Sequence, residues 1–228
     1  MLETISEWKY PHGWPPQKFL ADHSQITEHQ VEKLEELISK RVKETVIDEF
    51  LRSNPNIFVH CIRPMNTGHH GAWIIPQQSI RMSMAGVHRG LIPDYILGGR
   101  SSDGFSWFIL ELKGVDDFLF SETRSKKQLT LSSVANKAVC QTLEYIDYCS
   151  SIQSHLRDSL KLSDFREPKG LILIGREDEF ADNERRETLK SAWNRYLGGK
   201  IEIRTYDSLL RYAKAELPLV AQKIKAKE

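Results

Sequence analysis

Apolar residues between positions 27 and 53 recur with the 3.6-residue period of a helix that buries one face. The period is clearest in the second half of this segment, at Leu37, Ile38, Val42, Val46, Ile47, Phe50 and Leu51. Thr27 can cap the start of the helix, and Gln30 stands at the position that completes a capping box. The cluster Ser53-Asn54-Pro55 disfavours a helix, so we expect the helix to end there.

Four segments typical of β-strands follow the first helix. We expect these strands at residues 56–62, 72–82, 91–97 and 105–113, and Pro76 interrupts the second of them. Between the last two lies the segment GGRSSDG, which has the composition of a turn, so these two strands are predicted to form a hairpin. The last segment, FSWFILELK, is apolar on both faces, which favours a central strand that is covered on both sides.

Helices and strands alternate in the second half of the chain. We expect helices at residues 132–154, 181–197 and 207–215, the last of them capped by Asp207. Two short apolar segments between these helices predict strands at residues 170–175 and 201–205. The whole order predicts an α/β fold with a mixed central sheet between helices.

The predicted domain spans residues 36–216. Residues 1–35 contain a Pro- and Trp-bearing arm and the start of the first helix. Because the arm has few obvious places to bury its aromatic side chains, we expect it to pack onto the body or to take part in oligomerisation. The lysine-rich residues 217–228 are expected to form a basic, solvated tail.

The composition excludes several classes of protein. With 40% apolar and 28% charged residues, and only 13 Gly and 9 Pro, the chain is neither disordered nor collagen-like. No apolar run is long enough for a transmembrane helix, and the N-terminus lacks the pattern of a secretory signal. The three cysteines include no C-x-x-C pair, which argues against a disulfide scaffold or a zinc ribbon and favours the cytoplasm.

The distribution of charge is more informative than the net charge of +1. Residues 50–93 contain no Asp or Glu, although they contain four Arg and four His. An acid-free basic stretch suits a polyanionic substrate. The alternative is that acidic residues are simply depleted in a strand-rich segment.

Asp94, Glu111 and Lys113 form the most informative polar group. Glu111 and Lys113 are two residues apart on a predicted strand, so their side chains point to one face, and Asp94 lies on the strand that pairs with it. Two carboxylates supply the oxygen ligands that Mg²⁺ prefers, and a lysine can orient water or offset charge on a phosphate. The pattern therefore indicates a metal-dependent phosphodiesterase with Asp94 and Glu111 as metal ligands. The alternative is a cross-strand ion pair on a half-exposed sheet.

Two helices offer further polar side chains to this site. Gln141 and Tyr145 are four residues apart on one face of a predicted helix, from which they can reach the metal or a phosphate. In the first helix Glu44 lines up with the buried side, and a carboxylate there can complete the metal site. Asp48 or Glu49 can fill that role instead, and a solvated helix face is the alternative.

Three basic residues are candidates for contacts with the nucleic-acid backbone. Arg89 lies in the acid-free stretch, Lys126 lies in a polar loop, and Arg176 directly follows the predicted strand at 170–175. Phosphate contacts of this kind position a nucleic acid without reading its sequence.

A wider pattern runs through the chain. It consists of the helix that carries Glu44, the break LRSNPNIF that follows it, and the segments IPDYIL, FILELK, QTLEY, GLILIGRE and IEIRTYDSLL. Together these segments resemble the Shedu family of bacterial anti-phage defence proteins, over roughly residues 40–215. The resemblance implies a restriction-endonuclease-like αβββαβ core of the PD-(D/E)XK nuclease superfamily.

The resemblance also implies roles for individual residues. Asp94 and Glu111 correspond to the metal-binding carboxylates, Lys113 to the catalytic lysine, and Glu44 most closely to the acid of the first helix. The QTLEY segment, with Gln141 and Tyr145, resembles the Q-x-x-x-Y element of RecB-like nucleases.

The function implied is an endonuclease that depends on Mg²⁺ or Mn²⁺, cuts phage or other double-stranded DNA, and assembles as a homodimer or homotetramer. Two alternatives stay open. One is a non-catalytic nucleic-acid-binding or assembly subunit on a nuclease scaffold, and the other is a restriction or repair nuclease.

Overall fold

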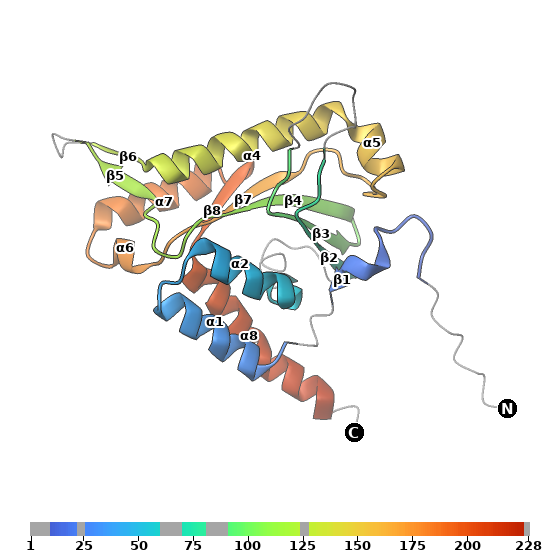
Figure 1. The fold of residues 1–228 in the computed structure, drawn as a ribbon, viewed down its shortest axis with the longest axis horizontal. Helices are drawn as coiled ribbons and strands as arrows, with labels where there is room; N and C mark the ends of the chain where they lie inside the picture. Colours follow the sequence, from blue (N-terminus) through green and yellow to red (C-terminus); the bar gives the residue numbers. More distant parts are fainter. Residues whose placement is uncertain (1–9, 22–25, 60–69, 81–90, 124–127, 226–228) are drawn as a thin grey trace.

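A computed structural model describes residues 10–21, 26–59, 70–80, 91–123 and 128–225 (Figure 1). Its centre is a six-stranded mixed sheet with the strand order β1-β2-β3-β4-β7-β8. The strands are β1 (Leu20–Ala21), β2 (Gly71–Pro76), β3 (Tyr95–Ser101), β4 (Gly104–Leu112), β7 (Lys169–Leu173) and β8 (Ile201–Arg204). Strands β1 to β4 are antiparallel neighbours, whereas β4, β7 and β8 run parallel. The predicted α/β class with a mixed central sheet is confirmed.

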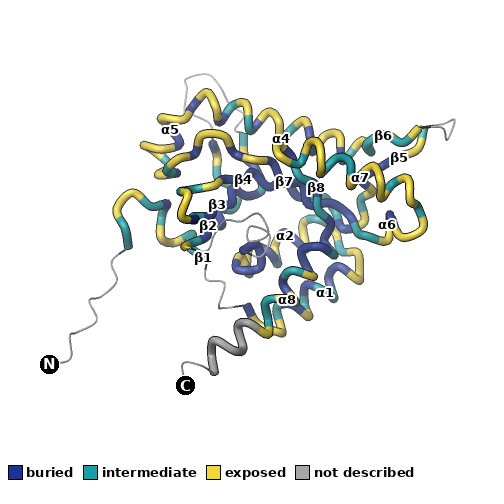
Figure 2. Tube along the Cα trace, turned by 180° about the vertical axis from the view of Figure 1, so that it is seen from behind, coloured by how far each residue is buried: buried dark blue, intermediate teal, exposed yellow. Residues whose placement is uncertain are grey.

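Helices cover both faces of this sheet (Figures 1 and 2). On one face lie α1 (Glu28–Ser39), α2 (Glu44–Ser53) and α8 (Tyr206–Lys225). On the other lie α4 (Ser133–Ser151) and α5 (Gln153–Asp158), while α7 (Glu184–Tyr196) flanks β8 at the edge of the sheet. The sheet residues alternate between these layers: Leu110 and Leu112 pack with α1, α2 and α8, whereas Ile109 packs beneath α4. The central strand β4 is therefore covered on both sides, as its sequence predicts.

The first predicted helix is two helices in the structure. Helix α1 begins with the predicted capping box between Thr27 and Gln30, but it ends at Ser39, and α2 begins only at Glu44. The amide of Arg41 donates to the Ile38 carbonyl and the amide of Val42 to the Leu37 carbonyl, which is the hydrogen-bond pattern of a Schellman helix end. Arg41 itself has a φ of 49°, in the left-handed region that usually belongs to glycine. The helical period continues across this break, so the pattern of apolar residues could not reveal it.

Three other boundaries also differ from the prediction. The segment after Asn54 is a 3₁₀ helix, η3 (Pro55–Phe58), rather than the start of a strand, and residues 60–62 of that predicted strand lie outside the described residues. Strand β3 starts after Asp94 and continues to Ser101, so the glycines assigned to the turn belong to the strand. Gly98 pairs with Trp107, and a Cβ at Gly98 would lie 2.5 Å from the indole ring. These glycines therefore make room for an aromatic side chain.

Helix α8 differs from the prediction at both ends. Its start is capped by Thr205, whose hydroxyl accepts from the Ser208 amide, and Asp207 lies in the first turn. The helix runs to Lys225, through Pro218, so the residues assigned to a basic tail are helical as far as the structure describes them.

The described part of the N-terminal arm packs onto its own domain. It contains η1 (Gln17–Phe19) and β1, and Trp14 stands edge-on to Trp73 of β2 at a centroid distance of 5.3 Å. The Trp73 indole N–H donates to the Tyr10 hydroxyl. Tyr10 and Trp14 are half-buried by these contacts, whereas Trp8 lies outside the described residues, so oligomerisation stays a prediction. Within the described residues, no helix is both long and apolar enough to cross a membrane.

Two smaller elements complete the fold next to the sheet. A separate two-stranded sheet forms from β5 (Phe120–Glu122) and β6 (Leu129–Leu131), and it projects beyond the start of α4 in Figure 1. The short helix α6 (Asp178–Ala181) precedes α7. The side chain of Glu179 accepts from the amides of Leu119 and Phe120 and pairs with Arg186, which fixes the chain between β4 and β5.

We expect Gly175→Ala to destabilise the protein strongly. Gly175 has a φ of 59°, and a Cβ there would lie 2.2 Å from the Asp117 carbonyl oxygen. Left-handed backbone and overpacking together predict a loss of about 2–4 kcal/mol, which corresponds to a melting temperature lower by about 5–12 °C. Thermal denaturation measures this shift. The matched control is Gly199→Ala, because nothing lies within 4 Å of a Cβ at Gly199, and an equal shift in both variants would contradict the prediction.

Candidate active site

Asp94, Glu111 and Lys113 converge where β3 begins and β4 ends. The Lys113 Nζ lies 2.8 Å from the Glu111 Oε1. Asp94 Oδ2 accepts from the Leu112 amide at 2.8 Å, which ties the residue before β3 to the strand that carries the other two. Glu111 lies in β4 and Lys113 directly follows its last residue, and their 2.8 Å contact shows that the two side chains lie on one side, as the sequence predicts.

This group is removed from solvent. The side chains of Glu111 and Lys113 expose only 5% and 13% of their surface. Burial and the charge of Asp94 raise the pKa of Glu111, the hydrogen bond and charge of Lys113 oppose them, and the net pKa is about 7. Burial also raises the pKa of Asp94, against the Leu112 amide and the charge of Lys113. Both carboxylates have raised pKa values because their charges are buried close together, and a further cation would stabilise the charged forms.

Lys113 is held as an ammonium by its neighbours. Burial by itself lowers its pKa, but the hydrogen bond to Glu111 and the charges of Glu111, Glu44 and Asp94 outweigh burial, so the pKa is raised. Its backbone is fixed as well, because the Lys113 carbonyl accepts from the Tyr206 hydroxyl at 2.7 Å and its amide donates to the Leu173 carbonyl at 2.9 Å. The ammonium therefore has a defined position.

Glu44 faces the same group from the first turn of α2. Burial raises its pKa, the charge of Lys113 lowers it, and the charges of Asp94 and Asp117 raise it. These couplings place its carboxylate near the acidic pair. Of the two alternatives, Asp48 is engaged by Arg52 and by the Tyr95 hydroxyl at 2.7 Å, and Glu49 is exposed. Both Glu44 and Asp48 therefore lie within electrostatic reach of Asp94, and Asp48 is the one already held by two side chains.

A family model described as Shedu protein SduA, C-terminal, matches residues 41–210, about three quarters of the chain. This chain belongs to the Shedu family. No curated protein matches the sequence. The matched region begins at Arg41 and ends at Leu210, so it includes the whole polar group and leaves out the arm and α1.

In this Shedu chain, the two predicted residues of α4 have different surroundings. Tyr145 is buried and its hydroxyl donates to the Ile92 carbonyl at 3.3 Å. Burial and the charges of Glu111 and Asp94 raise its pKa to about 12, which places it beside the acidic pair. Gln141 lies one turn earlier on the helix, and its buried Oε1 has no hydrogen-bond partner among the described residues. That oxygen is available to a water or a ligand.

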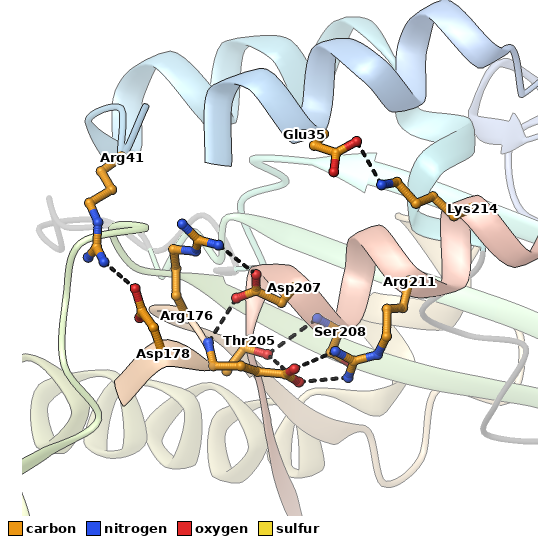
Figure 3. A network of polar contacts seen from close by, with 10 residues as sticks. Glu35, Arg41, Arg176, Asp178, Thr205, Asp207, Ser208, Arg211 and Lys214 are labelled. Atoms are coloured by element: carbon orange, nitrogen blue, oxygen red, sulfur yellow. Dashed lines mark hydrogen bonds and ion pairs between the residues drawn. The ribbon is translucent and has the colours of Figure 1, made fainter. Parts of the chain in front are cut away.

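Of the three predicted phosphate contacts, the structure describes only Arg176. Arg176 donates to Asp207 at 3.0 Å, and only 24% of its side chain is exposed (Figure 3). Its guanidinium therefore has a carboxylate partner already. Arg89 and Lys126 lie outside the described residues.

Two residues near the site carry no functional signal in the sequence analysis. Tyr206, whose hydroxyl holds the Lys113 carbonyl, belongs to the TYDSLL segment, which the resemblance includes without assigning a role. Asp117 accepts from the Gly114 amide at 2.7 Å and shapes the loop directly after Lys113. From the sequence alone, Tyr206 cannot be distinguished from an ordinary core tyrosine, nor Asp117 from an ordinary turn aspartate.

The donor set fits a hard divalent cation better than a soft one. Within the described residues, no group of three or more His, Cys, Asp or Glu side chains forms a metal site of its own. The available donors are carboxylate oxygens, and Mg²⁺ is usually held by one or two carboxylates, with water and substrate phosphate in its other positions.

Proposed function

We propose that this Shedu chain is a divalent-metal-dependent deoxyribonuclease that hydrolyses phosphodiester bonds in bacterial defence against phage. The proposal includes a restriction-endonuclease-like core of the PD-(D/E)XK kind, in which β3 and β4 carry the catalytic residues. Its main support is the convergence of Asp94, Glu111 and Lys113 at one buried place. Burying two acids and an ammonium costs folding free energy. This cost favours a catalytic role for the group over an accidental ion pair.

In this proposal Asp94 and Glu111 hold the cation. One oxygen of each is already engaged, Asp94 Oδ2 by the Leu112 amide and Glu111 Oε1 by Lys113, and these bonds orient the second oxygen of each carboxylate. The charge of Glu44 acts on this site from α2, although Glu44 does not form a three-acid cluster with the pair within the described residues. A bound Mg²⁺ or Mn²⁺ would polarise the phosphate and make a water molecule more acidic.

Lys113 orients the attacking water and offsets charge on the phosphate. An ammonium has three N–H donors, and Glu111 uses one of them. The other two donors can contact a water or a phosphate oxygen as negative charge develops there. Tyr206 limits the movement of the Lys113 backbone during this step.

Incubation with plasmid and linear DNA tests the proposal. We expect cutting with Mg²⁺ or Mn²⁺, no cutting with a chelator, and no cutting by Glu111→Ala or Lys113→Ala variants that keep the wild-type circular dichroism spectrum. Retained cutting in both variants would remove the proposal. Salt-sensitive DNA binding without cutting or metal uptake would instead support a non-catalytic binding subunit, and one recurrent cut sequence would support a restriction enzyme.

A further inference from the structure

The junction between α1 and α2 is tied to two distant parts of the chain by one side chain. The guanidinium of Arg41 donates to Asp116 at 2.7 Å, in the loop that follows Lys113. Its other terminal nitrogen donates to Asp178 at the start of α6, 137 residues away (Figure 3). One arginine thus connects the loop after the catalytic strand, the short helix α6 and the segment that leads into α2.

The backbone of Arg41 is unusual for an arginine. Arg41 follows the C-terminal end of α1 and has a φ of 49°. Glycine adopts this left-handed conformation without a steric penalty, whereas arginine does not. Its ion pairs lie at the surface, where the side chains of Arg41, Asp116 and Asp178 expose 39%, 67% and 45% of their area. Exposed pairs of this kind contribute little to overall stability. Glycine would serve the helix end as well or better, so the stability of the fold does not explain the arginine.

The start of α2, to which Arg41 leads, has no side-chain cap of its own. Helix α1 begins with a complete capping box, whereas Lys43, at the start of α2, makes no side-chain capping bond. Glu44 is the first residue of α2, three positions after Arg41, and its charge interacts with those of Lys113 and Asp94. The position of Glu44 therefore depends on how the junction is anchored.

We propose that Arg41 is a positioning residue that holds the first turn of α2, and so Glu44, against Asp94 and Lys113. This inference rests on the proposed nuclease function for its catalytic consequence. Arg41 itself touches neither acid of the pair; it acts through Asp116 and Asp178, which anchor the junction from two sides.

The variant Arg41→Gly separates this role from a role in folding. Glycine keeps the left-handed backbone, so the variant is expected to fold and to melt within a few degrees of the wild type. Without the clamp, the amides of Val46 and Ile47, which donate to the Lys43 carbonyl at the start of α2, should exchange with deuterium at least about 5-fold faster. Unchanged exchange at these amides would overturn the inference.

DNA cleavage supplies the second measurement. We expect kcat to fall by about 10-fold to 100-fold in Arg41→Gly with KM little changed, because a displaced Glu44 disturbs the reacting groups and not the binding of DNA. The matched control is Lys40→Ala, which removes the neighbouring exposed pair with Glu36 and should leave kcat unchanged.

Three outcomes of the cleavage measurement decide the matter. Wild-type kcat in Arg41→Gly overturns the inference. A loss confined to KM also overturns it, because Arg41 would then contact DNA directly. If the wild-type chain cuts no DNA with either metal, the proposed function fails, and the hydrogen-exchange result alone decides whether Arg41 holds the start of α2.

Discussion

Replacement of Lys113 by methionine is expected to reduce the rate of DNA cleavage by about 10²–10⁴-fold, the usual effect of losing a positioned proton donor or charge-stabilising group. Methionine keeps the unbranched shape of the lysine side chain and most of its volume, and is shorter by the nitrogen atom. It removes the ammonium that pairs with Glu111 at 2.8 Å and lies beside Glu44 and Asp94. Steady-state cleavage of plasmid DNA at saturating Mg²⁺ measures the loss.

Lys190→Met is the matched control for this experiment. Lys190 is also partly buried, and burial lowers its pKa. It lines a cavity of about 720 Å³ between α6, α7 and β8, away from the acidic pair. This variant removes the same group from a similar environment, so we expect it to retain the wild-type rate. Rates within about 3-fold of wild type for both variants would show that Lys113 has no part in the chemistry.

Glu111→Gln is expected to abolish activity and to stabilise the metal-free protein at pH 8. The folded state raises the pKa of Glu111 from 4.5 to about 7. Between these two values the folded chain binds more protons at this site than the unfolded chain, so the free energy of unfolding falls as the pH rises. Above pH 7 the wild type carries the full penalty of a buried charge beside Asp94, and glutamine carries none.

The stabilisation is expected to be of the order of 1–3 kcal/mol at pH 8, or a melting temperature higher by about 2–10 °C. The difference between this variant and the wild type should shrink toward pH 5, where the wild-type carboxyl is mostly protonated in the fold. Thermal denaturation at both pH values, with and without Mg²⁺, measures it. Added Mg²⁺ should raise the melting temperature of the wild type and leave the variant unchanged, because only the wild type keeps both proposed metal ligands.

Glu49→Gln serves as the control for these melts. It removes an exposed carboxylate from α2, and exposed substitutions usually change stability little, so we expect a shift below about 2 °C. A Glu111→Gln variant that is less stable than the wild type at pH 8 would contradict the prediction that the buried charge of Glu111 beside Asp94 destabilises the fold. It would mean that the ion pair with Lys113 stabilises the fold.

The local pattern of the sequence determined the architecture around β4. Nine residues of strand with apolar side chains on both faces require cover on both sides, and the helices supply it. Because side chains alternate between the two faces of a strand, residues two apart such as Glu111 and Lys113 are predicted to share a face without reference to the rest of the chain. The hairpin with β3 then brought Asp94 to the same end, although Asp94 itself lies just before the strand.

The local sequence pattern gave a wrong prediction at two places, the glycines of β3 and the break between α1 and α2. Gly98 and Gly99 have turn chemistry, but in the structure they are strand residues, because Trp107 needs the space that a side chain at Gly98 would occupy. The helical period passes across residues 40–43 without interruption, yet the helix ends there, because the left-handed conformation of Arg41 closes it. Neither contact is visible in the sequence.

The sequence by itself determined the α/β class, the two-sided burial of the central strand, and the pairing of a carboxylate and an ammonium on one face of it. Only the tertiary structure decided that Glu44 approaches the pair from another helix, that Tyr206 holds the Lys113 backbone, and that Arg41 meets Asp178 137 residues away. The reason is physical: alternation along a strand is set by neighbouring peptide units, whereas contacts between distant segments depend on how whole helices pack against the sheet.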